Sequence, residues 1–259
     1  MKSAYLEAND VAVGGTKAIL TLKNVGVAYP STRRFSRDLF WALKDVSLDL
    51  NQGETLGVVG RNGAGKSTLL KLLAGIIGPD RGVVVRNPNT TVSLLALQVG
   101  FMPQLTGREN AILSCILLGL SRKEARQRVK SIFDFAEVKA AIDKPVATYS
   151  AGMRARLGFG VAMEADPDIL LVDEVLGVGD VQFRKKSSEL LRARIISGRS
   201  VVIVSHEINT LSQLCDRLMM IEDGCTIMTG SVDDVLNVYR AQTSGHSAEQ
   251  VGVLGKGKG

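Results

Sequence analysis

Three short apolar segments recur along this chain, and each is followed by a polar loop. Residues 168–172 and the segments Thr55–Val59 and Ser200–Val204 are mainly apolar, without polar alternation. Such segments are typical of parallel strands that are covered on both faces of a sheet. A helix-like stretch over residues 66–74 follows the first of them. This alternation of strands and helices predicts an α/β fold with a parallel core sheet.

The region between the first two of these strands has a helical pattern instead. Thr106 with Glu109, and Ser121 with Glu124, each fit a capping box, in which two side chains start a helix. Behind the second box, apolar side chains recur at helical spacing at Ala125, Val129, Ile132, Phe133 and Ala136. We therefore expect a helical insert over about residues 106–165.

The C-terminal part begins with a predicted hairpin. Residues 217–222 and 225–229 flank Asp223-Gly224, a pair that favours a two-residue β-turn. Ser231 then starts a last helix that we expect to end near Ala241. Residues 241–259 are small and polar and are predicted to be a disordered tail, so that residues 1–240 form the folded domain.

Composition and charge narrow the classes of protein. The 259 residues are 45% hydrophobic and 22% charged, as in soluble globular proteins. The net charge of +6 permits nucleic acid, an anionic membrane or a phosphorylated ligand as partner, without choosing among them. The longest apolar run, residues 111–120, is too short to cross a bilayer, which needs about 20 apolar residues. Three separated cysteines and two histidines exclude a disulfide scaffold and a structural zinc site.

A phosphate-binding motif lies between the first strand and the helix after it. Residues 60–67 fit G-x-x-x-x-G-K-[ST], in which glycines turn successive N–H groups toward an anion at the positive end of a helix. Lys66 is expected to reach the terminal phosphates, and the Ser67 hydroxyl to bind magnesium. The residues predicted to contact a nucleoside triphosphate here are Gly60, Asn62, Gly63, Ala64, Gly65, Lys66, Ser67 and Thr68.

Acids and a histidine follow the other two strands. Asp173 ends the second strand and is expected to lie beside the magnesium, while Glu174 can polarise an attacking water molecule. A second acid next to the residue that binds magnesium favours hydrolysis of the nucleotide over transfer of its phosphate to another substrate. His206 follows the third strand, where a neutral imidazole could bond to the γ-phosphate or to that water.

With these motifs in place, the chain resembles the nucleotide-binding subunits of ATP-binding cassette (ABC) transporters. The deciding stretch is Tyr149-Ser-Ala-Gly-Met153, which is similar to the family signature Leu-Ser-Gly-Gly-Gln. Ser150 and Gly152 match that signature, whereas Tyr149, Ala151 and Met153 depart from it. The resemblance implies ATP and Mg²⁺ as ligands. It also implies that two copies enclose two ATP molecules, each copy offering Ser150 and Gly152 to the γ-phosphate bound by the other.

Further residues match other motifs of the family. The resemblance implies that Gln104 senses magnesium and couples to a membrane subunit, although in the branch discussed next this glutamine is often displaced. Asp180 falls in the position of the family's aspartate loop. Tyr29 occupies the place of the aromatic residue that stacks on adenine, with Trp41 as a rival candidate. The implied fold adds an antiparallel β subdomain and a helical subdomain to the mostly parallel core sheet.

The branch of the family is indicated by four stretches: residues 106–110, 149–154, 173–180 and 183–186. Together they resemble the ATPases that export lipid-linked O antigen, capsule or teichoic acid in bacteria. The resemblance implies an ATP-hydrolysing subunit at the cytoplasmic face of the membrane, working as a homodimer beneath a separate multi-span channel subunit. Some O-antigen ATPases carry an added carbohydrate-binding domain. This chain stops near the end of the cassette, so no direct glycan binding is expected.

Three rival functions remain open at this stage. An ABC-type ATPase acting on nucleic acid is compatible with the basic balance. The gap between the phosphate loop and the signature, however, holds no extended heptads, and the chain has one cassette, so nucleic acid is not the expected partner. An ABC transporter for a different substrate and a P-loop kinase are the other two.

Overall fold

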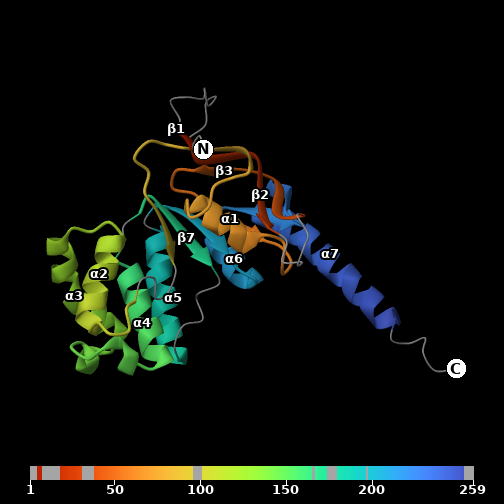
Figure 1. Cartoon of the computed structure of the whole chain (residues 1–259). Coiled ribbons are helices and arrows are strands. Elements are labelled where there is room, and N and C mark those ends of the chain that lie inside the picture. The colour runs from red at the N-terminus through yellow and green to blue at the C-terminus, as the bar shows by residue number, and fades with distance from the viewer. Residues whose placement is uncertain are drawn as a thin grey trace. The chain divides into compact units, whose positions relative to one another are not determined.

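The computed structural model describes residues 5–7, 18–30, 38–95, 101–164, 167–173, 180–196 and 198–253. The chain divides into two compact units (Figure 1). The first combines Met1–Pro88 with Val202–Gly259, and the second is Asn89–Val201. The observed fold is the mixed α/β fold that the sequence predicts, with parallel and antiparallel strand pairs and helices.

The first unit is built on a sheet with the strand order β1-β5-β2-β3-β10-β9-β4. Antiparallel pairing joins β2 to β3, β2 to β5 and β9 to β10, whereas β4 pairs in parallel with β9. The antiparallel part of the sheet confirms the β subdomain that the resemblance implied. Its strands are β1 Tyr5–Glu7, β2 Ala18–Pro30, β3 Leu39–Asn51, β4 Thr55–Val59, β5 Arg81–Arg86, β9 Arg217–Glu222 and β10 Cys225–Gly230.

Local sequence explains the elements next to the phosphate loop. All five residues of β4 are buried, as its unbroken apolar pattern predicts. The β9–β10 turn is Asp223-Gly224, and both residues have positive φ, 47° and 78°, as a tight hairpin turn of this kind requires. The helices of this unit are α1 Lys66–Leu73, α6 Ile208–Leu214 and α7 Val232–Val253. Strand β8, Ser200–Val204, is fully buried and crosses the boundary between the units.

The second unit is mainly helical. It contains α2 Gly107–Leu117, α3 Arg122–Ala136, α4 Ala151–Ala162 and α5 Val181–Ile196, with short 3-10 turns at Lys139–Ala141 and Val146–Thr148. Strands β6 Val92–Leu95 and β7 Ile169–Asp173 pair in parallel. Both predicted capping boxes are present, at Thr106 and Ser121. The five apolar α3 side chains predicted from helical spacing are all buried in the core of this unit.

The end of the last helix was predicted too early. Helix α7 starts after Ser231, whose Oγ accepts a hydrogen bond from the Asp234 N–H, but it continues to Val253 instead of ending near Ala241. Residues 241–253 contain small and polar side chains but no proline, so nothing in them blocks the backbone bonds of a helix. Within the described part of the chain, no helix is long and apolar enough to cross a membrane.

Candidate ATP site

The phosphate loop, residues 60–67, connects β4 to α1 in the first unit. Gly63 and Gly65 have φ values of 84° and 105°, a region that glycine enters without strain. A Cβ added to Gly65 would lie 2.6 Å from the Ala42 carbonyl oxygen, and one added to Gly60 would lie 2.2 Å from that of Ile221. The loop backbone therefore packs directly against β3 and β9, and side chains at Gly60 and Gly65 are excluded.

Lys66 is held inside this loop. Its side chain is only 7% exposed, and its Nζ donates hydrogen bonds to the carbonyl oxygens of Gly60, at 2.7 Å, and Arg61, at 3.0 Å. Helix α1 begins at the N-cap Gly65, and among the described residues no side chain caps its first N–H groups. Uncapped N–H groups beside a buried ammonium form a binding site for an anion. The loop thus fits the phosphates of a nucleotide.

The β9–β10 hairpin supports the phosphate loop from outside the motif. The Gly224 N–H donates to the Ala64 carbonyl oxygen at 3.1 Å, and the Lys44 N–H donates to the Gly224 carbonyl oxygen at 2.7 Å. A Cβ at Gly224 would lie 2.8 Å from the Ala42 carbonyl oxygen. Sequence reasoning identified Gly224 as a turn residue but missed this support, because the contact joins residues far apart in the chain.

The other predicted residues of the loop differ in exposure. Ala64 is buried and Thr68 half-buried, whereas Asn62 and Ser67 are exposed. Because Ser67 is exposed in the first turn of α1, a magnesium ion can reach its hydroxyl, an oxygen ligand of the kind that Mg²⁺ prefers. Among the described residues, no group of three or more His, Cys, Asp and Glu side chains could hold a metal ion.

His206 also belongs to the first unit. It is exposed and directly follows β8 and the buried Ser205. The Ser205 Oγ accepts a hydrogen bond from the Glu207 N–H at 3.0 Å, which turns the backbone sharply at His206. The predicted position of this histidine at the end of a buried strand is confirmed, and its catalytic role stays a prediction.

The two adenine candidates have different surroundings. Trp41 lies beside Ala28 across the β2–β3 pair, and its ring is covered by the Arg81 guanidinium, whose Cζ is 3.5 Å from the ring centroid. The same ring packs against Gly26, where an added Cβ would lie 2.8 Å from its Cζ3 atom. The Trp41 ring therefore packs between Arg81 and Gly26, within the sheet. Tyr29 is half-buried and is paired across the strands with Phe40.

In the second unit, Asp173 ends β7 and is half-buried. Glu174, the predicted catalytic acid, lies outside the described residues. Gln104 is exposed in a turn that precedes α2. The predicted roles of all three in hydrolysis and magnesium binding remain predictions.

The signature stretch forms the N-terminus of α4. Ser150 is the N-cap, and its Oγ accepts a hydrogen bond from the Met153 N–H at 3.1 Å. Gly152 is exposed, and a Cβ there would have only the Ser150 Oγ within 4 Å among the described atoms, at 3.9 Å. A serine and a glycine at an accessible helix N-terminus can approach a phosphate of another molecule.

The departures from the family signature have a packing explanation. Tyr149 is 3% exposed, and its hydroxyl donates to the Ala141 carbonyl oxygen at 2.6 Å. The ring fits against Gly107 at the start of α2, where an added Cβ would lie 2.0 Å from the Tyr149 Oη. Met153 packs against the core of the same unit. Tyr149 thus anchors the backbone immediately before Ser150, a role that sequence reasoning did not assign.

Asp180 joins α5 to α4. Its Oδ1 accepts a hydrogen bond from the Phe183 N–H at 2.9 Å, and its carboxylate forms an ion pair with Arg156 of α4. The Phe183 N–H, and secondarily the Arg156 charge, lower the pKa of Asp180. Arg156 also contacts Glu137, which is paired with Lys186 at 2.8 Å. Asp180 is therefore tied to the helix that begins with the signature stretch.

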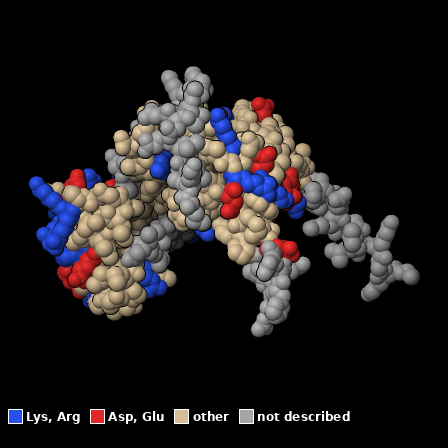
Figure 2. Space-filling model, turned by 45° about the horizontal axis from the view of Figure 1, so that its top comes forward, with Lys and Arg blue, Asp and Glu red and all other residues tan. Residues whose placement is uncertain are grey.

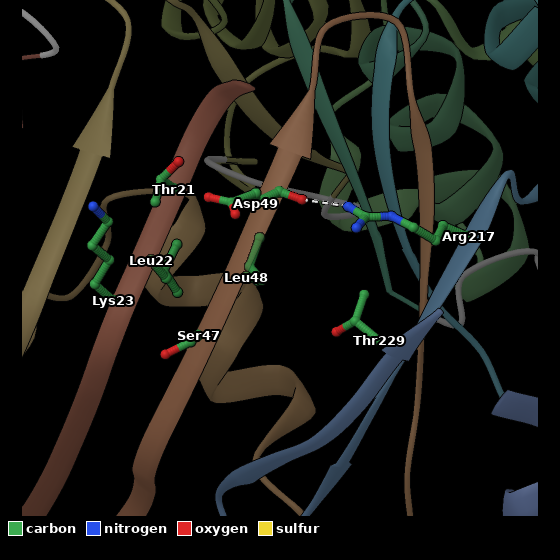
Figure 3. A pocket seen from close by; sticks show the side chains of 8 residues that line it. All are labelled: Thr21, Leu22, Lys23, Ser47, Leu48, Asp49, Arg217 and Thr229. Atoms are coloured by element: carbon green, nitrogen blue, oxygen red, sulfur yellow. Dashed lines mark hydrogen bonds between the residues drawn. The ribbon is translucent and has the colours of Figure 1, made fainter. Parts of the chain in front are cut away.

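A separate pocket of about 260 Å³ lies on the sheet of the first unit (Figure 3). At this pocket the Arg217 Nη2 donates to the Asp49 carbonyl oxygen at 2.7 Å. The Arg217 Nε is 2.6 Å from the Glu54 carboxylate, which neutralises the guanidinium charge. None of the predicted site residues lines this pocket, which is formed by Thr21, Leu22, Lys23, Ser47, Leu48, Asp49, Arg217 and Thr229.

Comparisons with known proteins agree with the motifs. The family model described as ABC transporter matches residues 43–177. The O-antigen export system ATP-binding protein RfbB of Klebsiella pneumoniae is 43% identical over 201 residues, covering 78% of this chain and 81% of that protein. The teichoic acids export ATP-binding protein TagH of Enterococcus faecalis is 42% identical over 78% of this chain, which spans 45% of that longer protein.

The fold is also that of solved ABC cassettes. A dimeric structure of a post-hydrolysis state of the ATP-binding cassette MJ0796, bound to ADP and Pi, superposes with a TM-score of 0.68 at 25% identity. That match covers 82% of this chain and 98% of the cassette. Motifs, fold and relatives agree, and the chain belongs to the ABC transporter family as an ATP-hydrolysing cassette.

Proposed function

We propose that this chain is the ATPase subunit of a bacterial exporter for a lipid-linked surface polysaccharide of the O-antigen or teichoic acid type. The observation that carries the proposal is the similarity, at 43% and 42% identity over 78% of the chain, to two proteins named for such export. The relatives include both substrate types, so the shared chemistry is a glycan carried on a lipid, and the sequence does not choose between them.

The nucleotide chemistry of the proposal uses the residues of the phosphate loop. The uncapped α1 N-terminus and Lys66 would bind the β- and γ-phosphates. Mg²⁺, which neutralises charge that develops on the phosphates, would be held by Ser67, Asp173 and Gln104. Glu174 would orient and deprotonate the attacking water, with His206 donating a hydrogen bond to the γ-phosphate. Tyr29 is our candidate for stacking on adenine, because the Trp41 ring is already covered by Arg81.

The proposed working form is a homodimer that encloses two ATP molecules. The MJ0796 cassette, which shares this fold, was solved as a dimer. In this chain, Ser150 and Gly152 lie at an accessible helix N-terminus, which would bind the γ-phosphate held by the other copy. The ion pair with Arg156 would hold Asp180 to that helix. The dimer would act at the cytoplasmic face of the membrane with a separate multi-span channel subunit, without binding the glycan itself.

The ATPase part of the proposal is tested with Glu174→Gln in the whole chain. The variant should bind ATP with wild-type affinity, lose turnover and form a stable dimer, because the nucleotide is trapped before hydrolysis. Calorimetric titration with ATP measures the affinity, a phosphate-release assay measures the turnover, and size-exclusion chromatography with ATP measures dimer formation. Normal turnover in this variant would contradict the role of Glu174.

The transport part needs the complex. The chain, purified with its membrane subunit into vesicles, should move a lipid-linked glycan only with hydrolysable ATP, and Lys66→Ala should abolish the movement. Co-purification with nucleic acid in place of a membrane protein, and a salt-sensitive gel shift, would instead support the rival nucleic-acid function.

A further inference from the structure

Helix α3 presents a row of positive charges on the surface of the second unit. Arg122, Lys123, Arg126 and Lys130 are all exposed and, at 3.6 residues per turn, fall within about 100° of the helix circumference. The buried side of α3, which packs in the core of this unit, is centred about 90° around the helix from these cations. Lys and Arg side chains gather over the helices at the left of Figure 2. We name these four residues the cationic stripe.

The stripe is not balanced by neighbouring acids. Among the residues that the structure describes, none forms an ion pair with any of its four members. The acid Glu124 is held in the capping box with Ser121, and Asp134 is paired with Lys139 at 2.7 Å. Both nearby carboxylates of α3 are therefore engaged elsewhere, and the stripe offers an unneutralised positive surface.

An apolar feature lies at the same end of the α2–α3 helix pair. Ile116 and Leu117, in the last turn of α2, are 40% and 62% exposed. The chain then turns tightly, with the Leu120 N–H bonded to the Cys115 carbonyl oxygen and Gly119 at a φ of 97°, and α3 begins at Arg122. Two exposed aliphatic side chains thus directly precede the cationic stripe.

We propose that this α2–α3 tip binds the anionic surface of a lipid bilayer directly. Acidic headgroups attract Lys and Arg side chains, and the aliphatic stems of those side chains, with Ile116 and Leu117, can enter the apolar layer just beneath. A nucleic-acid backbone would satisfy the charges but leave the aliphatic pair in water, so the combination favours a bilayer. The inference rests on the proposed work of the chain at a membrane, but it adds a contact made by this chain itself.

The charge contribution is tested by co-sedimentation of the whole chain with phosphatidylcholine vesicles, with and without phosphatidylglycerol. The wild-type chain should bind the vesicles that contain phosphatidylglycerol and should not bind those of phosphatidylcholine alone. The triple variant Arg122→Gln, Arg126→Gln, Lys130→Gln should bind about a hundredfold more weakly, since each cation near such a surface contributes several-fold. A matched triple variant at exposed lysines elsewhere, made of Lys23→Gln, Lys71→Gln and Lys185→Gln, removes the same charge and should bind nearly as wild type does.

The apolar contribution is tested with Leu117→Trp and vesicles containing brominated lipid. Fluorescence quenching above that of wild type, which contains Trp41 alone, is expected if residue 117 enters the bilayer. Three results would overturn the proposal: no binding of wild type, equal weakening in both triple variants, or vesicle binding without quenching at residue 117. The proposal would also be overturned, in favour of an acidic protein partner, if the triple variant of the stripe lost binding to the membrane subunit but bound vesicles as wild type does.

Hydrolysis of ATP without vesicles is measured for every variant, and it should stay at the wild-type rate, because the stripe lies outside the nucleotide motifs. An active ATPase that does not bind vesicles would overturn the lipid contact and leave the proposed function standing. A wild-type chain without ATPase activity would contradict the proposed function, whatever its behaviour toward vesicles.

Discussion

The contact between Gly107 and Tyr149 gives a quantitative prediction about the signature stretch. Gly107 is the first residue of α2, and alanine there would ordinarily stabilise a helix by about 0.5–1 kcal/mol. Here, however, the added Cβ would lie 2.0 Å from the Tyr149 Oη and 2.9 Å from the Phe133 Cζ. Tyr149 and Phe133 are 3% and 1% exposed, so neither ring can move into solvent without cost.

The magnitude follows from two opposing effects. Overpacking of a buried site costs about 1–3 kcal/mol, and displacing the Tyr149 hydroxyl from the Ala141 carbonyl oxygen costs about 1 kcal/mol more. Subtracting the helix gain, we expect Gly107→Ala to lower the free energy of unfolding by about 2 kcal/mol. Because Ser150 follows Tyr149 directly, the rate of ATP hydrolysis should fall further than the affinity for ATP, which depends on the phosphate loop.

Urea unfolding followed by circular dichroism, and ATPase kinetics, measure both effects. Gly78→Ala is the control, since an added Cβ there meets no described atom within 4 Å, and it should change stability by less than about 0.5 kcal/mol. In a Tyr149→Leu background, which removes the hydroxyl, Gly107→Ala should cost about 1 kcal/mol less. The reasoning would be refuted if Gly107→Ala left the free energy of unfolding unchanged, or if it lowered that free energy equally in both backgrounds.

Three other predictions concern charge and thiol chemistry. Lys66→Ala should reduce ATP affinity strongly without unfolding the chain, which calorimetric titration with a non-hydrolysable ATP analogue measures; unchanged affinity would count against the phosphate loop. The lowered pKa of Asp180 means that its ion pair with Arg156 is present above the ordinary aspartate pKa and is lost as pH falls through the lowered value. Arg156→Gln should therefore raise that pKa modestly in an NMR titration, whereas no change would exclude an electrostatic contribution from Arg156. Burial raises the pKa of the Cys115 thiol to about 11, so at pH about 8 iodoacetamide should label the partly exposed Cys225 well before Cys115, as mass spectrometry of the native chain can show.

The features predicted correctly from sequence are those fixed by short-range interactions. Thr106 with Glu109, and Ser121 with Glu124, form capping boxes because each pair is three residues apart and each side chain bonds to the nearby backbone. The Asp223-Gly224 turn has the same origin, since both residues adopt positive φ at low cost. The extension of α7 beyond Ala241, which the sequence does not predict, is also local, because small polar residues favour coil but still permit a helix.

Other parts of the site depend on contacts between distant residues, and pattern reasoning could not reach them. From the sequence, Tyr29 is the candidate for adenine stacking and Trp41 is a rival. Their difference arises from Arg81, which reaches the Trp41 ring from another strand. Likewise, the sequence shows only that Tyr149 departs from the family signature. The packing of its ring against Gly107, which is far away in the sequence, explains the departure.

The phosphate loop combines both kinds of information. The motif states which chemical groups bind the phosphates, but its backbone path depends on Ala42 and Ile221, whose carbonyl oxygens leave no room for side chains at Gly65 and Gly60. Gly224 completes this support by bonding to the Ala64 carbonyl oxygen. Because β3, β9 and the hairpin turn all contact the phosphate loop, the antiparallel part of the sheet is a structural component of the nucleotide site. A cassette reduced to its motifs would therefore keep the chemistry of phosphate binding and lose the geometry on which that chemistry depends.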